Sequence, residues 1–179
     1  MKKNVLILSS SPRKNGNSDI LCDEFAKGAA ESGNYVEKIS LREKNINYCT
    51  GCGACNDLKG KCSQKDDMAE VKEKMINADV IVFASPVYFY TMAGQMKTLI
   101  DRCCFFYTEI QNKDFYYILT AADTDTSAMD RVLTEFDGFV VCLENINEKK
   151  CIYGTGVWKK GEVINTKAMS EAYEAGKQV

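Results

Sequence analysis

The segment CTGCGACNDLKGKC, residues 49–62, holds four cysteines in the spacing C-x2-C-x2-C-x6-C. Thiolates at such close spacing bind iron–sulfur clusters or zinc, and pairs of them also form disulfides. Zinc is the weaker metal interpretation, because zinc sites usually take two cysteine pairs with a longer gap between them. A [4Fe–4S] cluster and metal-free thiols both stay open. If a cluster is present, its predicted ligands are Cys49, Cys52, Cys55 and Cys62.

The other five of the nine cysteines are predicted to lie outside such a cluster. Cys22, Cys103 and Cys142 fall on predicted helices near their apolar faces, and Cys151 falls in a predicted strand. These four are therefore expected in the core. Cys104 follows Cys103 directly, so the two side chains cannot face the same way.

A polar loop, SSSPRKNGNS at residues 9–18, follows a short apolar run and precedes a helical pattern. Its hydroxyls, guanidinium and amide can all donate hydrogen bonds to an oxyanion, and the amino end of a helix favours negative charge. The same residue types also occur in ordinary turns. The loop matches neither the Walker pattern nor the dinucleotide fingerprint, so it predicts a phosphate site of another kind.

Two further loops follow apolar strands. SPVYFYT at residues 85–91 carries three aromatic side chains that could wall a flat ligand, and TAADT at residues 120–124 is made mostly of small residues. A phosphate loop, an aromatic loop and a small-residue loop together suggest a mononucleotide with a planar ring, and FMN fits this description.

The composition limits the chemistry. The chain has 179 residues, a net charge of −2 and no histidine, so a cofactor is the economical source of reactivity. Neither the charge nor the apolar runs indicate a nucleic-acid partner or a membrane segment. With no recognisable secretion signal, we expect a cytoplasmic protein, in which nine cysteines favour metal or redox roles over a disulfide scaffold.

These loops need a framework that brings them together. Apolar or alternating runs predict five strands, at residues 4–8, 35–41, 79–84, 115–120 and 151–153. Helical spacing predicts helices from Ser18 to Gly33, from Met68, over 93–103, over 129–143 across Gly138, and from Asn165 or Thr166. Alternating strands and helices predict an α/β fold with an open, doubly wound parallel sheet, which binds ligands beyond the carboxyl ends of its strands.

Across essentially its whole length the sequence resembles the NAD(P)H-dependent FMN reductase branch of the flavodoxin-like proteins. The resemblance rests on SSSPRKNGNS, ASPVYFYTMAGQMKTLIDR at 84–102, TAADTD at 120–125 and the tail from YGTGVWKKGEV. It implies a single flavodoxin-like domain over residues 1–179, a five-stranded sheet of order 2-1-3-4-5, and dimers or tetramers. The cysteine-rich insert at 49–62 resembles the cluster motif of iron–sulfur flavoproteins.

By position, the resemblance assigns two groups of FMN contacts. The phosphate would be held by Ser9, Ser11, Arg13, Asn17 and Ser18. The ring would lie against Pro86, Val87, Tyr88 and Phe89, with Thr120, Ala121 and Asp123 near its other edge. Ser10 stands where related sequences usually carry glycine.

The expected function is that of an FMN-dependent oxidoreductase. It would pass electrons from NAD(P)H to a flavin, quinone or similar acceptor, with no catalytic side chain. A non-enzymatic electron carrier with a [4Fe–4S] cluster is the alternative, and its acceptor would be a protein. A phosphatase is disfavoured, because the first loop lacks a cysteine followed five residues later by arginine.

Overall fold

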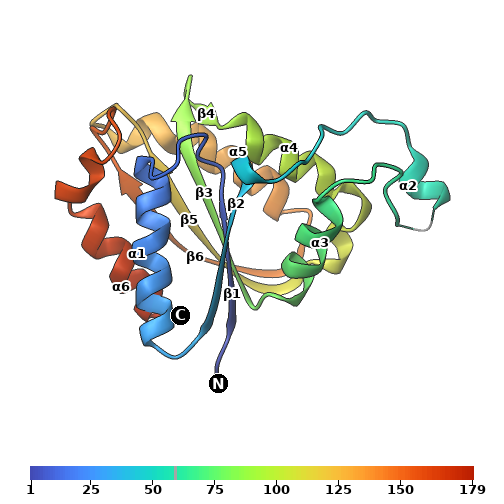
Figure 1. The fold of residues 1–179 in the computed structure, drawn as a ribbon, viewed down its shortest axis with the longest axis horizontal. Coiled ribbons are helices and arrows are strands. Elements are labelled where there is room, and N and C mark those ends of the chain that lie inside the picture. Colours follow the sequence, from blue (N-terminus) through green and yellow to red (C-terminus); the bar gives the residue numbers. More distant parts are fainter. Residues whose placement is uncertain (59) are drawn as a thin grey trace.

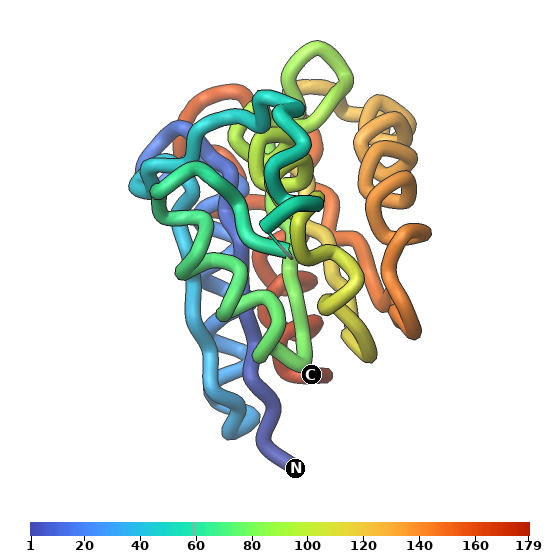
Figure 2. The backbone as a smooth tube through the Cα atoms, turned by 90° about the vertical axis from the view of Figure 1, so that its right-hand side faces the viewer, coloured from blue at the N-terminus to red at the C-terminus, as the bar shows by residue number. Residues whose placement is uncertain are grey.

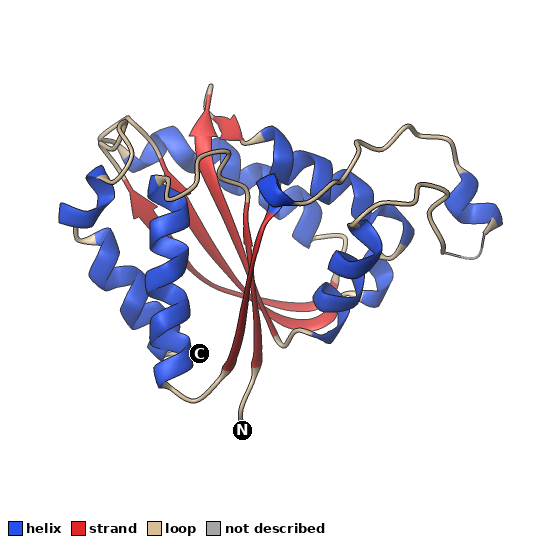
Figure 3. Ribbon diagram, in the orientation of Figure 1, coloured by secondary structure: helices blue, strands red, loops and turns tan. Residues whose placement is uncertain are grey.

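The computed structural model describes residues 1–58 and 60–179 and contains one sheet with helices on both faces (Figures 1 and 3). The strands are β1 (Asn4–Ser9), β2 (Tyr35–Ser40), β3 (Val80–Tyr88), β4 (Thr91–Met92), β5 (Gln111–Thr120) and β6 (Glu144–Gly154). The α-helices are α1 (Asn17–Glu31), α2 (Ala54–Asp57), α3 (Met68–Asn77), α4 (Gly94–Arg102), α5 (Asp130–Val140) and α6 (Ala168–Lys177).

The sheet runs in the order β2-β1-β3-β5-β6, and these five strands are parallel. Counted along the chain without β4, this is the predicted order 2-1-3-4-5. The sequence did not predict β4, a two-residue strand that pairs antiparallel with the end of β3 and lies off this path. The predicted doubly wound α/β sheet is confirmed, with this added hairpin.

Two apolar layers cover the sheet because the strand side chains alternate between its faces. Val5 and Ile7 of β1 pack with α1 and α6, whereas Leu6 and Leu8 pack on the side of α3, α4 and α5. Phe83 of β3 is the centre of the second layer, where its ring contacts those of Phe115, Phe136 and Phe139.

The last strand and the helix before it differ from the prediction. The helix passes through Gly138 as expected but ends at Val140, and Leu143 lies outside it. Strand β6 begins at Glu144 rather than at Cys151. Its first seven residues are mostly polar and half-buried or exposed, so they carry no apolar pattern. Backbone pairing with β5 makes them a strand.

The cysteines outside the insert follow the elements that carry them. Cys22 and Cys103 are fully buried, as predicted, and Cys151 is half-buried. Cys142 is exposed, so its prediction as a core residue was wrong. The reason is that α5 ends before it and leaves Cys142 in a turn. Cys104 is also exposed, consistent with its opposite orientation to Cys103.

Candidate functional site

The loops that follow β1, β3 and β5 meet at the carboxyl edge of the sheet and enclose a hollow. Most of the sequence-predicted contact residues line it: Ser11, Arg13, Asn17, Ser18, Pro86, Val87, Tyr88, Thr120 and Ala121. The lining also includes Gly16, Ala122, Val157 and Trp158, which the sequence analysis did not single out. Val157 and Trp158 lie within the tail motif that follows β6, so that motif was the available signal.

The first loop is held against β3 by Ser10. Its backbone N–H donates to the Ala84 carbonyl at 2.9 Å, and its hydroxyl donates to the same oxygen at 2.8 Å. The unusual serine at this position is therefore bonded inside the protein. The loop is also tight at Gly16, where a Cβ atom would lie 2.5 Å from the Ser11 hydroxyl oxygen. A side chain there would displace the Ser11 hydroxyl and crowd the Arg13 carbonyl oxygen, 3.1 Å away.

Ser18 gives the clearest sign that the loop is built to receive a ligand. Its hydroxyl is buried at the amino end of the 15-residue helix α1, and no group in residues 1–58 or 60–179 bonds to it. A buried hydroxyl without a partner costs free energy, so its retention is explained by a ligand that accepts its hydrogen bond. An anion at this helix end also interacts favourably with the helix dipole. The donor set fits the phosphate of FMN.

Arg13 and Asn17 have a second role that the sequence did not indicate. Arg13 Nη1 donates to the Trp158 carbonyl at 3.1 Å, and Asn17 Nδ2 donates to the Lys159 carbonyl at 3.0 Å. Asn17 Oδ1 accepts from the Gly161 N–H at 3.0 Å. These bonds tie the first loop to the segment after β6. The Asn17 amide is therefore engaged within the protein, whereas Arg13 keeps further N–H groups for a phosphate.

Asp19 supports the loop through hydrogen bonds, although it was not among the predicted site residues. Its buried carboxylate accepts from the Ser9 hydroxyl at 3.2 Å and from the Asn15 N–H at 2.9 Å, so it joins the two ends of the loop. Burial alone would raise the pKa of Asp19, but the Asn15 hydrogen bond and the charges of Lys38 and Arg42 hold it below its ordinary value. Ser9 thus contacts Asp19 and does not line the hollow.

The aromatic loop is the turn between β3 and β4. Tyr88 lines the hollow, while Phe89 is 97% exposed and lies outside the lining. Phe89 and Tyr90 have φ angles of 51° and 63°, a left-handed conformation that is strained for bulky residues. The predicted contact of Phe89 with the ring stays a prediction.

The third loop contributes Thr120 and Ala121, both buried at the end of β5. Asp123 does not line the hollow. Its carboxylate accepts from the Asp125 N–H at 3.0 Å, and its carbonyl accepts from the Gly156 N–H at 2.7 Å. Asp123 therefore joins this loop to the segment after β6, and its predicted ring contact stays a prediction.

The cysteine-rich segment projects from the helical face beside α3 and the chain at residues 103–110 (Figures 1 and 2). Cys49 and Cys52 are exposed, and Cys55 and Cys62 are half-buried. Within the described part of the chain, no three metal-ligating side chains converge closely enough to hold a metal ion. The four sulfurs as arranged therefore do not form a ligand set for a cluster.

Cys104, which the spacing did not indicate, lies beside this segment. Burial, followed by the neighbouring thiols of Cys55 and Cys49, raises the pKa of Cys104. In contrast, the Ala54 N–H and the Ser63 hydroxyl lower the pKa of the exposed Cys52. The thiolate, which is the reactive form, is therefore favoured at Cys52 and disfavoured at Cys104 next to the segment.

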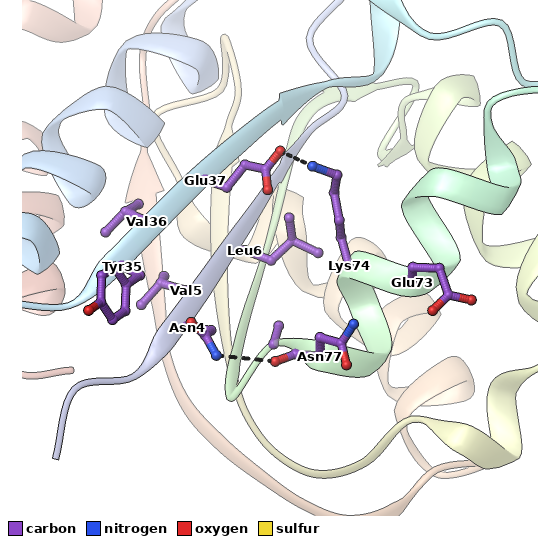
Figure 4. A pocket seen from close by; sticks show the side chains of 10 residues that line it. Asn4, Val5, Leu6, Tyr35, Val36, Glu37, Glu73, Lys74 and Asn77 are labelled. Atoms are coloured by element: carbon purple, nitrogen blue, oxygen red, sulfur yellow. Dashed lines mark hydrogen bonds and ion pairs between the residues drawn. The ribbon is translucent and has the colours of Figure 1, made fainter.

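A second hollow lies between the amino-terminal halves of β1 and β2 and helix α3 (Figure 4). Its walls include the ion pair of Glu37 with Lys74, and Asn4 Nδ2 donates to the Asn77 carbonyl at 3.5 Å. Parallel sheets bind ligands at their carboxyl edge, which is the other end of these strands. We therefore place the functional site in the first hollow.

Comparison with known proteins assigns the family. Residues 3–141 match the model of the NADPH-dependent FMN reductases, and the chain belongs to this family. An iron-sulfur flavoprotein of Archaeoglobus fulgidus is 49% identical over 92 residues, which are 51% of this chain and 41% of that protein. The chain spans about half the length of the curated relatives it matches.

Solved structures share the fold across nearly the whole chain. An NAD(P)H:quinone oxidoreductase from Methanothermobacter marburgensis matches with a TM-score of 0.73 at 16% identity, covering 99% of this chain and 97% of that one. An FMN-dependent NADH-azoreductase from Bacillus anthracis, in complex with FMN, matches with a TM-score of 0.75 at 14% identity, covering 98% of both chains. None of the helices in residues 1–58 and 60–179 combines the length and apolar character needed to cross a membrane.

Proposed function

We propose that the chain binds FMN in the hollow at the carboxyl edge of the sheet and passes electrons from NAD(P)H to a flavin, quinone or similar acceptor. The observation that carries the proposal is the buried Ser18 hydroxyl, which lacks a partner in the described residues at the amino end of α1. Family membership supports it independently. Bound FMN supplies the hydride-accepting ring, which no side chain can replace.

The protein residues hold and orient the ligand. Ser11, Ser18 and Arg13 are proposed to bind the phosphate, with the N–H groups of the first turn of α1. Pro86, Val87 and Tyr88 are proposed to lie along the ring, with Thr120 and Ala121 at its edge. Tyr88 is 39% exposed, so a second flat molecule has access to this side of the hollow. No catalytic side chain is assigned.

Anaerobic mixing tests the proposal. The flavin-loaded protein is mixed with NADH and, separately, with NADPH, and the flavin absorbance is followed. We expect at least one nucleotide to bleach the flavin, and a quinone added afterwards to restore the absorbance. If neither nucleotide bleaches it while dithionite does, the protein is not an NAD(P)H oxidoreductase.

The second candidate function is an electron carrier of the iron–sulfur flavoprotein type. It is favoured by the insert at 49–62 and by the names of the curated relatives. Cys49, Cys52, Cys55 and Cys62 are the proposed ligands of its [4Fe–4S] cluster. Their sulfurs do not converge among the described residues, so the segment would have to rearrange around the cluster.

Iron and acid-labile sulfide, counted per chain after anaerobic expression, decide this candidate. About four of each, lost in Cys55→Ser, support a cluster. Flavin without iron or sulfide would leave the cysteines as thiols.

We also propose a cytoplasmic homo-oligomer, a dimer or tetramer. Light scattering can measure its mass in solution. Its electron acceptor would be a small molecule or a protein.

A further inference from the structure

The cysteine-rich segment leaves and re-enters the body of the protein through a narrow neck. Asn45 and Asp67 face each other there: the Asn45 N–H donates to the Asp67 carboxylate at 2.7 Å, and the Asp67 N–H donates to the Asn45 carbonyl at 3.0 Å. The Asn47 N–H donates to the Asp66 carboxylate at 3.1 Å. The two ends of the segment 48–65 are thus fixed to each other.

Arg102, the last residue of α4, joins this neck to the helical layer. Its side chain and that of Asp66 are each only 1% exposed, and they form a two-pronged ion pair with distances of 2.6 and 3.0 Å. Arg102 Nη1 also donates to the Asn47 carbonyl at 2.7 Å. One guanidinium therefore contacts both flanks of the segment, and its planar fork pairs with the Asp66 carboxylate through two bonds, a geometry that a lysine ammonium does not reproduce.

The same guanidinium reaches one of the four cysteines. Arg102 Nη2 lies 3.5 Å from the Cys62 sulfur and donates to it. Arg102 Nε is buried and has no partner among residues 1–58 and 60–179. The guanidinium therefore keeps one N–H donor that is not hydrogen-bonded. Cys49 and Cys52 have local contacts instead, with the Gly51 N–H at 3.5 Å and the Ser63 hydroxyl at 3.8 Å.

We propose that Arg102 is a positioning residue that, with Asp66, fastens the cysteine-rich segment to α4 and holds Cys62 in a fixed place. The hydrogen bonds that Arg102 makes in the described chain reach none of the other three cysteines of the insert. Cys62 is then the fixed cysteine around which these three would rearrange to bind a cluster. The inference deepens the electron-carrier candidate. Only the purpose given to the contacts rests on that proposed function, because the contacts themselves exist without any bound group.

We call the ion pair of Arg102 with Asp66 the clasp. Thiol alkylation tests directly whether it holds Cys62 in place. The full chain is reduced, treated with a chelator and exposed to N-ethylmaleimide, and each cysteine is followed by mass spectrometry. In Arg102→Gln and in Asp66→Asn, Cys62 should react roughly tenfold faster than in the wild type, because local opening exposes it. Cys52 is already exposed, so its rate should change by less than about twofold.

Two internal controls separate this effect from general unfolding. Cys22 and Cys103 are fully buried, so they report loss of the core. Lys97→Gln removes a charge from the exposed face of the same helix, where Lys97 pairs with Asp101, and should leave every rate unchanged. Arg102→Lys keeps the charge but loses the fork, and Cys62 should still react faster than in the wild type.

The proposal is overturned if Cys62 reacts at the wild-type rate in both Arg102→Gln and Asp66→Asn. It is also overturned if Cys22 and Cys103 are labelled as fast as Cys62 in all three clasp variants, because the pair would then support the whole core. None of these rates depends on flavin reduction or on a cluster, so failure of the proposed function and failure of this inference are distinguishable.

Discussion

At the scale of single residues, removal of the Ser18 hydroxyl should affect protein stability and ligand binding differently. It has no hydrogen-bond partner in the described chain, so Ser18→Ala removes a polar group that gains nothing from folding. We expect the flavin-free variant to be as stable as the wild type or about 1 kcal/mol more stable. FMN binding should weaken by about 0.5–1.5 kcal/mol, the value of one hydrogen bond.

Thermal unfolding of the flavin-free protein and a flavin titration give the two numbers. Ser11 serves as a comparison, because its hydroxyl already donates to the Arg13 carbonyl at 3.0 Å. Ser11→Ala should therefore lower stability as well as affinity. A Ser18→Ala variant that binds FMN as tightly as the wild type would contradict the assignment of this hydroxyl to the phosphate.

Asp19 predicts a pH dependence. Its pKa is lowered in the folded protein, so its stabilising effect is complete above its unfolded value and is lost as the pH falls through the lower, folded value. At pH 7, Asp19→Asn should cost roughly 2–4 kcal/mol, because Lys38 and Arg42 lose a buried partner. Toward pH 3 the difference from wild type should shrink. Lys38, whose pKa is raised, keeps its contribution until the pH rises above its ordinary value.

Urea unfolding at pH 7 and near pH 3 measures both differences. Asp23→Asn is the matched control, since Asp23 pairs with the same lysine but is 58% exposed. Its effect should stay below about 1 kcal/mol at either pH. A cost of Asp19→Asn that stays constant across this range would show that the charge of Asp19 is not what matters.

The residue scale also shows what the sequence could not provide. The hydroxyls, arginine and helix start of the first loop identify a phosphate site by their chemistry alone. The bonds of Asn17 to Lys159 and Gly161 join positions more than 140 residues apart, and no local pattern encodes them. Asp19 was missed for a similar reason, because an acidic residue in the first turn of a helix usually interacts only with the helix dipole.

At the scale of elements, two glycines set the position of the helix that carries the phosphate loop. A Cβ atom on Gly28 of α1 would lie 2.1 Å from the Tyr173 carbonyl oxygen of α6, and one on Gly176 would lie 2.1 Å from that of Phe25. The backbones of α1 and α6 are therefore in direct contact at both glycines. The apolar periodicity predicted both helices, but no local pattern predicts this reciprocal contact.

Alanine substitutions test the contact, because two effects of opposite sign compete. Gly28→Ala gains up to about 1 kcal/mol of helix propensity but meets a backbone atom that cannot move aside, so we expect a net loss of about 1–3 kcal/mol. Gly138→Ala in α5 is the control. Described atoms leave open space around its Cβ position, and it should gain about 0.5–1 kcal/mol.

Denaturant unfolding gives the two free energies. If Gly28→Ala proves stabilising like Gly138→Ala, the close crossing of α1 and α6 is not required.

Strand β6 is an element whose full length the sequence pattern could not predict. Its polar first half is a strand because β5 offers a partner, and this tertiary cause leaves no periodicity to find.

At the scale of the whole molecule, the parallel sheet explains why loops distant in sequence form one site. The loops after β1, β3 and β5 share the carboxyl edge because those strands are neighbours in the sheet. Alternation of strands and helices predicted this meeting point, and the family resemblance supplied the strand order. The cysteine-rich segment is attached to the helical layer through Arg102, and spacing alone gave no indication of that anchor.

The central claim is that the hollow binds FMN by its phosphate as well as by its ring. Calorimetric titration of the flavin-free protein with FMN and with riboflavin, which lacks the phosphate, tests it most directly. We predict that FMN binds at least about tenfold more tightly than riboflavin, from charge-assisted bonds worth roughly 1.5–3 kcal/mol. Arg13→Ala should remove much of that difference, because the charge that distinguishes FMN from riboflavin is then lost. Equal affinities for the two flavins, or no binding of either, would contradict the account.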